Sequence, residues 1–121
     1  MAFQELSPAQ MADWVAAVRA AGHTPVVLDV REDFEVQAAN VQQQAQSQGF
    51  TLQYMPMGHI PSQLNDLPDE DAPLAILCHH GQRSAAVAHF LAQRGYSQLY
   101  NITGGIDYWS RFDASIPRYV K

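Results

Sequence analysis

Apolar and polar residues along the chain follow two alternating patterns, which predict strands separated by helices. The runs VVLDV at 26–30 and LAIL at 74–77 are almost entirely apolar, as in strands that are buried on both faces. TLQYM at 51–55 and QLYNI at 98–102 are predicted as two further strands, and residues 3–6 as an edge strand. Alternating strands and helices favour a mostly parallel sheet of about five strands, with helices on both faces.

Apolar residues at helical spacing place helices between these strands. The first helix follows Ser-Pro-Ala-Gln at 7–10, which offers an N-cap residue, a Pro at the first helical position and a Gln for a capping box. A second helix is predicted over 84–94, with Gly95 after it as the stop. The pair Gly104-Gly105 predicts a turn before a last short helix.

The segment between the first two buried strands is predicted as one longer helix, over residues 31–49. Four residues at helical spacing would share its apolar face, namely Phe34, Ala38, Val41 and Ala45. Gly49 would end the helix, and its Gln-rich remainder would face solvent. A further short helix is expected over 60–67.

Composition is that of an ordinary globular protein, with 47% hydrophobic and 16% charged residues. We expect one domain over residues 1–121, since this length is sufficient for a single core. No run of about 18 apolar residues occurs, so no membrane-spanning helix is expected. The first ten residues lack the basic start and apolar stretch of a secretory signal. One cysteine cannot form an internal disulfide, and a cytoplasmic location is the expectation.

The charge distribution argues against a nucleic-acid partner. The formal net charge is -5, and a nucleic-acid surface needs clustered positive charge. The basic residues are instead scattered singly along the chain, at Arg19, Arg31, Arg83, Arg94, Arg111, Arg118 and Lys121.

The one cysteine stands where a parallel sheet usually places its site. LAIL runs directly into Cys78, so the thiol is expected just beyond the carboxyl end of a strand. Gly81 lets the following loop turn, loop N–H groups and the next helix N-terminus can face an anion, and Arg83 adds positive charge. Our hypothesis is that Cys78 is a nucleophile that these groups hold as a thiolate. The alternative is a buried core cysteine, a common role of this residue.

Four motifs in this order resemble those of rhodanese-type sulfurtransferases. CHHGQRS at 78–84 is similar to their active-site loop, LDVRE at 28–32 to an early strand-end motif, YMPM at 54–57 to the segment before a short helix, and GGIDYW at 104–109 to a late Gly-Gly…Trp motif. The resemblance covers nearly the whole chain and implies a single rhodanese-like α/β domain. It also implies that Cys78 attacks the outer sulfur of a donor such as thiosulfate, that sulfite leaves, and that an acceptor takes the sulfur from the resulting persulfide. This chemistry requires no cofactor and no metal, and we expect neither.

The loop residues after Cys78 would bind the donor and the persulfide, and they are His79, His80, Gly81, Gln82, Arg83 and Ser84. Their backbone amides would stabilise the persulfide, and Arg83 would bind or orient the anion. Ser84 would be the N-cap or a first-turn residue of the next helix, donate to the sulfur, or do both. Two interpretations of His79 and His80 stay open: side chains that point outward, which we favour, or side chains that help to bind the donor. Consecutive Cys-His-His is poor geometry for zinc.

Asp29 and Arg31 close the strand that the resemblance places beside the active loop. We expect them to support the site by bracing the loop, through an ion pair or through backbone hydrogen bonds. A long-range effect of their charges on the site is the alternative.

Three functions are compared on this basis. The first is a sulfurtransferase that moves sulfane sulfur from thiosulfate, or from a protein persulfide, to a thiophilic acceptor. The second is a persulfide carrier or sulfur-binding regulatory module with little turnover alone. A phosphatase is the least favoured, because phosphatase loops place one residue more between their cysteine and arginine than the four between Cys78 and Arg83.

Overall fold

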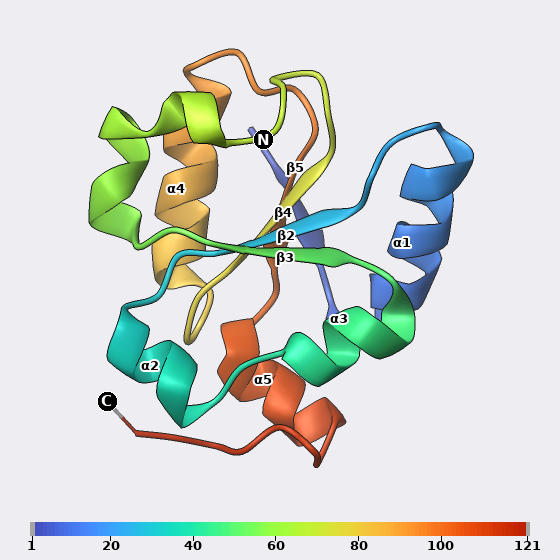
Figure 1. Ribbon diagram of the computed structural model, residues 1–121, viewed down its shortest axis with the longest axis vertical. Coiled ribbons are helices and arrows are strands. Elements are labelled where there is room, and N and C mark those ends of the chain that lie inside the picture. The colour runs from blue at the N-terminus through green and yellow to red at the C-terminus, as the bar shows by residue number, and fades with distance from the viewer. Residues whose placement is uncertain (1, 121) are drawn as a thin grey trace.

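The structure is a computed structural model that describes residues 2–120, so Met1 and Lys121, which the single-domain prediction includes, lie outside the described residues. Five strands form one sheet (Figure 1), and they are β1 (Gln4–Leu6), β2 (Val26–Asp29), β3 (Thr51–Tyr54), β4 (Leu74–Leu77) and β5 (Leu99–Ile102). The helices are α1 (Met11–Ala20), α2 (Asp33–Ala38), α3 (Gln42–Gln48), α4 (Gln82–Ala92) and α5 (Gly105–Phe112). Three 3₁₀ segments complete the fold, namely Pro8–Gln10, Met57–Ser62 and Leu64–Asp66.

The sheet has the strand order β1-β5-β4-β2-β3, and every pair of neighbours is parallel. The predicted strands are confirmed to within one or two residues at their ends, and the predicted edge strand pairs with β5. β4 lies in the centre of the sheet, between β5 and β2. Because the strands are parallel, the chain leaves β4 and β2 at the same edge of the sheet, where Cys78 and Arg31 follow.

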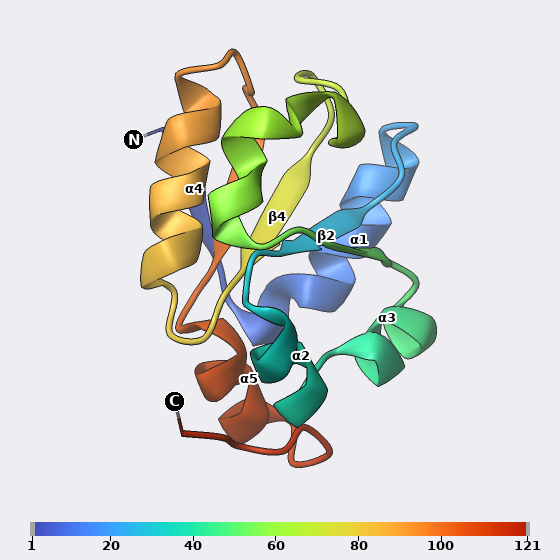
Figure 2. The ribbon, with the colours of Figure 1, turned by 60° about the vertical axis from the view of Figure 1, so that its left-hand side comes forward.

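Helices cover both faces of the sheet, as predicted (Figures 1 and 2). On one face, Val27, Ala75 and Ile102 pack against residues of α1 and α5. On the other face, strand residues of the opposite parity pack against α4 and the 3₁₀ segment Met57–Ser62. Figure 2 shows α4 and α1 on opposite sides of β4 and β2. This alternation follows from the two-residue period of a strand.

The single helix predicted over residues 31–49 is wrong: the segment forms two helices, α2 and α3, separated at residues 39–41. Ala39 is extended, with φ −161° and ψ 143°. The buried Arg31 side chain explains the break, because its Nη2 donates to the Ala39 carbonyl at 2.9 Å and its Nη1 donates to the Glu35 carbonyl at 3.2 Å. These bonds satisfy carbonyl groups at the end of α2, so the helix can stop there. Phe34, expected on the apolar face, is 61% exposed.

The remaining helices differ from the prediction mainly at their ends. α4 begins at Gln82, two residues earlier than expected, because Gly81 adopts φ +95° and serves as its N-cap. The short helix predicted over 60–67 is instead two 3₁₀ segments with Pro61 inside the first. Gly49 does end α3, with φ +85°.

Candidate active site

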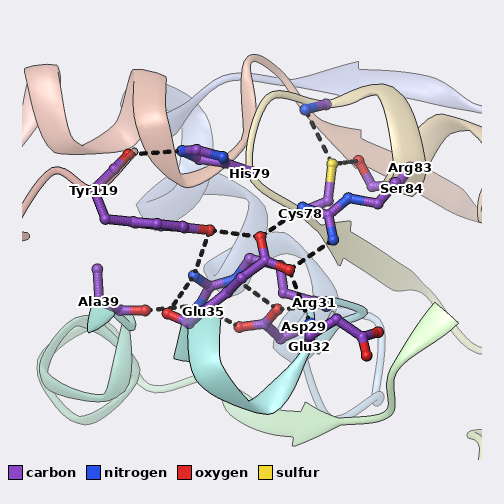
Figure 3. Close-up of polar contacts among 11 residues, drawn as sticks. Asp29, Arg31, Glu32, Glu35, Ala39, Cys78, His79, Arg83, Ser84 and Tyr119 are labelled. Carbon is purple, nitrogen blue, oxygen red and sulfur yellow. Dashed lines mark hydrogen bonds and ion pairs between the residues drawn. The ribbon is translucent and has the colours of Figure 1, made fainter. Parts of the chain in front are cut away.

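Cys78 directly follows β4 and lies at the bottom of a small pocket at the carboxyl edge of the sheet. Its side chain is 1% exposed. The Gly81 N–H donates to Sγ at 3.0 Å, and the Ser84 hydroxyl lies 3.2 Å from Sγ. The pocket has a volume of about 220 Å³, and it is lined by Cys78, His79, His80, Gln82 and Arg83. The structure therefore places a backbone amide and a hydroxyl of the predicted loop in contact with the sulfur, and Figure 3 shows the Ser84 hydroxyl beside it.

The N-terminus of α5 holds the shape of the loop. The Ile106 N–H donates to the Cys78 carbonyl at 2.9 Å, and the Asp107 N–H donates to the His79 carbonyl at 3.0 Å. In a planar trans peptide the N–H points opposite to the carbonyl. Because the Cys78 and His79 carbonyls face α5, the N–H groups of His79 and His80 point away from it. Gly105 makes this approach possible, because it has φ +62° and an added Cβ would overlap both carbonyl oxygens.

Ser84 joins Cys78 to a buried polar chain that the sequence did not predict. Because Gly81 is the N-cap of α4, Ser84 lies in its first turn, where its hydroxyl faces both Sγ and Asn101 Oδ1. Asn101 Nδ2 donates to the Gly81 carbonyl at 3.2 Å and to Glu5 Oε2 at 3.1 Å. These acceptors fix the amide so that its oxygen faces Ser84. The sequence signal for this chain of hydrogen bonds was Asn101, a polar residue within the predicted strand QLYNI.

Arg83 lines the pocket but is paired with Glu35 of α2. Its Nη1 donates to Glu35 Oε2 at 2.8 Å and its Nη2 donates to Oε1 at 2.7 Å. Arg83 is 25% exposed in its side chain and Glu35 is fully buried. A guanidinium has five N–H donors, so three remain without a partner among residues 2–120. Glu35 was not among the predicted site residues, although a carboxylate that follows the early strand-end motif was a visible signal.

The environment of Glu35 keeps its carboxylate charged. Burial alone would raise its pKa, but hydrogen bonds from Arg83, from the Glu32 backbone N–H and from Tyr119 lower the pKa from 4.5 to about 2. The hydrogen bond to Glu35 likewise raises the pKa of Arg83. The pair is therefore ionised at neutral pH.

Asp29 and Arg31 form the buried ion pair that the sequence analysis considered. Arg31 Nε donates to Oδ1 at 2.9 Å and Nη2 donates to Oδ2 at 2.8 Å, and both side chains are fully buried. Arg31 also holds the Glu35 and Ala39 carbonyls. The pair thus braces α2 directly. It reaches the 78–84 loop through Glu35, which binds Arg83, and through Tyr119, which accepts from Arg31 Nη1 and stacks on His79.

The two histidines behave differently. His80 is exposed, as favoured, whereas the expectation of an outward side chain is wrong for His79, which is 3% exposed. The His79 ring stacks on Tyr119, with centroids 4.1 Å apart and planes 12° apart, and its Nε2 lies 3.1 Å from the Tyr119 carbonyl. Burial and the neighbouring His80 lower the pKa of His79, so its imidazole is neutral at pH 7. No sequence pattern indicated that Tyr119 contacts His79, because forty residues separate them.

One group in the described part of the chain approaches the geometry of a metal site. It comprises His79, His80 and Asp107, whose ligand atoms lie within 4.8 Å of one another. The two imidazole rings are tilted by 32° with their centroids 3.8 Å apart, and His79 Nε2 already lies 3.1 Å from the Tyr119 carbonyl. Asp107 is already paired with Arg111 at 3.3 Å and Arg118 at 3.4 Å. These residues do not fit a metal ion well.

Comparison with known proteins agrees with this fold. The model of the rhodanese-like domain family matches residues 11–112, and the chain belongs to this family. A thiosulfate sulfurtransferase GlpE from Actinobacillus succinogenes is 33% identical over 112 residues, which cover 92% of this chain and 87% of that protein.

Solved structures show the same fold. A rhodanese-related protein from Thermoplasma volcanium superposes with a TM-score of 0.70 at 26% identity, covering 92% of this chain and 94% of that one. A rhodanese-like domain protein from Staphylococcus aureus gives a TM-score of 0.67 at 22% identity, covering 98% of this chain and 100% of that one. Between residues 2 and 120, no helix has the length and apolar character needed to cross a membrane. The cytoplasmic location stays a prediction.

Proposed function

We propose that the protein is a sulfurtransferase that transfers sulfane sulfur from thiosulfate, or a similar donor, through a persulfide on Cys78. The observation that carries the proposal is the position of Sγ, at the bottom of a 220 Å³ pocket and 3.0 Å from the Gly81 amide. An amide in this position stabilises a negative charge on the sulfur without any metal or cofactor. Kinship with a thiosulfate sulfurtransferase over most of the chain supports the same chemistry.

The reaction proceeds in two half-reactions. The Cys78 thiolate attacks the outer sulfur of thiosulfate, a new S–S bond forms, the S–S bond of thiosulfate breaks, and its electron pair leaves with sulfite. A thiophilic acceptor such as cyanide then attacks the terminal sulfur of the persulfide, and the electron pair of the broken S–S bond returns to Cys78 as a thiolate. No electron is supplied from outside the donor and acceptor.

The Ser84 hydroxyl can change its hydrogen bond when the charge on the sulfur changes. Its hydroxyl has one proton, and both Sγ and Asn101 Oδ1 are within reach of it. When Cys78 is a thiol, the S–H can donate to Ser84 while Ser84 donates to Asn101. When Cys78 is a thiolate, the Ser84 proton can turn to the sulfur, so the hydroxyl stabilises the charged form.

Arg83 would orient the donor. Three of its N–H groups remain for an anion at the pocket, while Glu35 holds the other two. The bidentate pair fixes the guanidinium plane beside the site and reduces the net positive charge offered to a dianion such as thiosulfate.

That reduced charge favours a second candidate, a persulfide carrier that accepts sulfur from a protein partner and turns over thiosulfate poorly. Charge complementarity to a dianion is less important for such a donor. The two candidates predict different kinetics for the same Cys78 chemistry.

Thiocyanate formation from thiosulfate and cyanide tests the sulfurtransferase proposal. We expect ping-pong kinetics, with parallel lines in double-reciprocal plots, and complete loss of activity in Cys78→Ala. Ser97→Ala, which changes an exposed serine outside the pocket, is the control for substitution. Turnover that survives in Cys78→Ala would contradict the proposal.

Thiosulfate turnover that stays near background, together with rapid transfer from a protein persulfide, would favour the carrier. Release of phosphate from an aryl phosphate that is lost in Cys78→Ala would favour a phosphatase.

A further inference from the structure

The C-terminal segment 113–120 returns to the active site, although the family match ends at residue 112. Ile116 anchors the segment in the core at 3% exposure. Beyond it, Tyr119 reaches the space between the active loop and α2 (Figure 3). This contact therefore belongs to the chain itself and lies outside the part that the family model describes.

Tyr119 touches three residues of the site through three different groups. Its hydroxyl donates to Glu35 Oε1 at 3.0 Å and accepts from Arg31 Nη1 at 3.1 Å. Its ring stacks on His79, and its carbonyl lies 3.1 Å from His79 Nε2. A hydroxyl has one proton and two lone pairs, so the bonds to Glu35 and Arg31 are compatible with each other. Burial is the main reason that the pKa of Tyr119 rises to about 12, so the hydroxyl remains a donor at working pH.

The Glu35 carboxylate connects Tyr119 to the pocket. Oε1 accepts from both Tyr119 and Arg83 Nη2, at 3.0 and 2.7 Å. Tyr119 is fixed independently of Arg83 by its stack on His79 and its bond to Arg31, so it adds a restraint on Glu35 that does not move with Arg83. A carboxylate held in this way presents its two oxygens to Arg83 in one orientation, which fixes the guanidinium plane at the pocket.

We propose that Tyr119 is a positioning residue of the active site, which fixes Glu35 and thereby holds Arg83 where it attracts an anionic donor to Cys78. The inference rests on the proposed function for its meaning in catalysis. It predicts that the Tyr119 hydroxyl affects the capture of anions more than the reactivity of the sulfur, because the hydroxyl contacts neither Sγ nor the loop amides.

Alkylation of Cys78 tests this placement without requiring sulfur transfer. Iodoacetate and iodoacetamide attack the same thiolate and differ mainly in charge, so the ratio of their rates reports the positive field that Arg83 creates at the pocket. We expect Tyr119→Phe, which keeps the ring stack, to lower the iodoacetate-to-iodoacetamide ratio by about threefold to tenfold. Tyr54→Phe, which removes the hydroxyl of an exposed tyrosine on β3, is the matched control and should leave the ratio unchanged.

A double-mutant cycle identifies the route of the effect. In an Arg83→Gln background, Tyr119→Phe should change the ratio less than about 1.5-fold, because the residue through which Tyr119 acts is already gone. In the thiosulfate assay, Tyr119→Phe should raise KM by about fivefold while kcat stays within about twofold. All of these variants retain Ile116, so the C-terminal segment stays anchored in the core in both measurements.

The outcomes separate this inference from the proposed function. An unchanged alkylation ratio in Tyr119→Phe would overturn the inference, and so would an equal fall in both alkylation rates, which would indicate lost access or folding. An equal effect of Tyr119→Phe with and without Arg83 would also overturn it. Failure of the wild type to form a persulfide would refute the sulfurtransferase, while the alkylation ratio would still decide the role of Tyr119.

Discussion

Replacing Glu35 by Gln should destabilise the protein in a pH-dependent way. The carboxylate is fully buried and its pKa falls from 4.5 to about 2, because the donors around it outweigh the cost of burial. Such a shift corresponds to about 3 kcal/mol of stabilisation of the folded state at neutral pH. Because the folded-state pKa is below the unfolded one, this stabilisation is complete above about pH 5 and is lost as the pH falls towards about 2.

Urea unfolding of the wild type and Glu35→Gln across this range measures the effect. At pH 7 we expect the free energy of unfolding of Glu35→Gln to be lower by about 3 kcal/mol, and we expect the gap to shrink steadily below about pH 4. Asp13→Asn, an exposed carboxylate on α1, is the control and should show a gap below about 0.5 kcal/mol throughout. A gap of the same size at pH 7 and pH 3 would refute the reasoning, because it would show that the charge of Glu35 is not what stabilises the fold.

Three further substitutions test other parts of the account. Gly105→Ala should abolish persulfide formation and lower the free energy of unfolding by at least about 2 kcal/mol, because a Cβ would overlap the Cys78 and His79 carbonyl oxygens. The control is Gly58→Ala, where a Cβ meets nothing within 4 Å, and it should be nearly neutral in both assays. Ser84→Ala should reduce kcat/KM for thiosulfate by about tenfold or more, the usual cost of a lost hydrogen bond to a charged group, and kinetics equal to those of the wild type would exclude the role of the hydroxyl. Asp29→Asn should cost about 3–5 kcal/mol in urea unfolding, because it leaves Arg31 buried without its counter-charge; a cost below about 1 kcal/mol would show that the pair does not brace α2.

Much of the fold followed from local patterns. LAIL and VVLDV are buried on both faces and coincide with the central strand β4 and its neighbour β2, because continuous apolar runs are typical of a parallel sheet under helices. The place of Cys78 followed from the strand before it. Gly81 and Gly105 adopt positive φ and allow the loop and α5 to approach each other, and the Gly-Gly pair was predicted as a turn before the last helix.

The errors arose where a buried side chain, and not the pattern of apolar residues, decides the local structure. The break between α2 and α3 depends on Arg31, a buried side chain that takes carbonyl groups from the end of α2. Helical periodicity cannot report such a contact, so the prediction of one helix over 31–49 failed. The exposed Phe34 is a further consequence, because α2 turns a different face towards the core.

The site was predicted as a loop, and its supporting residues were missed. Glu35, Asn101 and Tyr119 lie on three other segments, and only the tertiary fold brings them to Arg83, Ser84 and His79. A polar residue inside a buried strand was the available signal for Asn101, and a carboxylate just after the early strand-end motif was the signal for Glu35. No comparable signal existed for Tyr119, which the sequence places in an exposed-looking tail.

The central claim, a persulfide on Cys78, is tested most directly by the intact mass of the protein after incubation with thiosulfate, with Cys78→Ser treated in parallel. The account predicts a gain of one sulfur atom in the wild type alone, reversed by cyanide with release of thiocyanate. No added sulfur on a wild-type protein whose Cys78 is reduced and reactive to iodoacetamide would contradict transfer from thiosulfate, and a gain of sulfur in Cys78→Ser would contradict the role of Cys78.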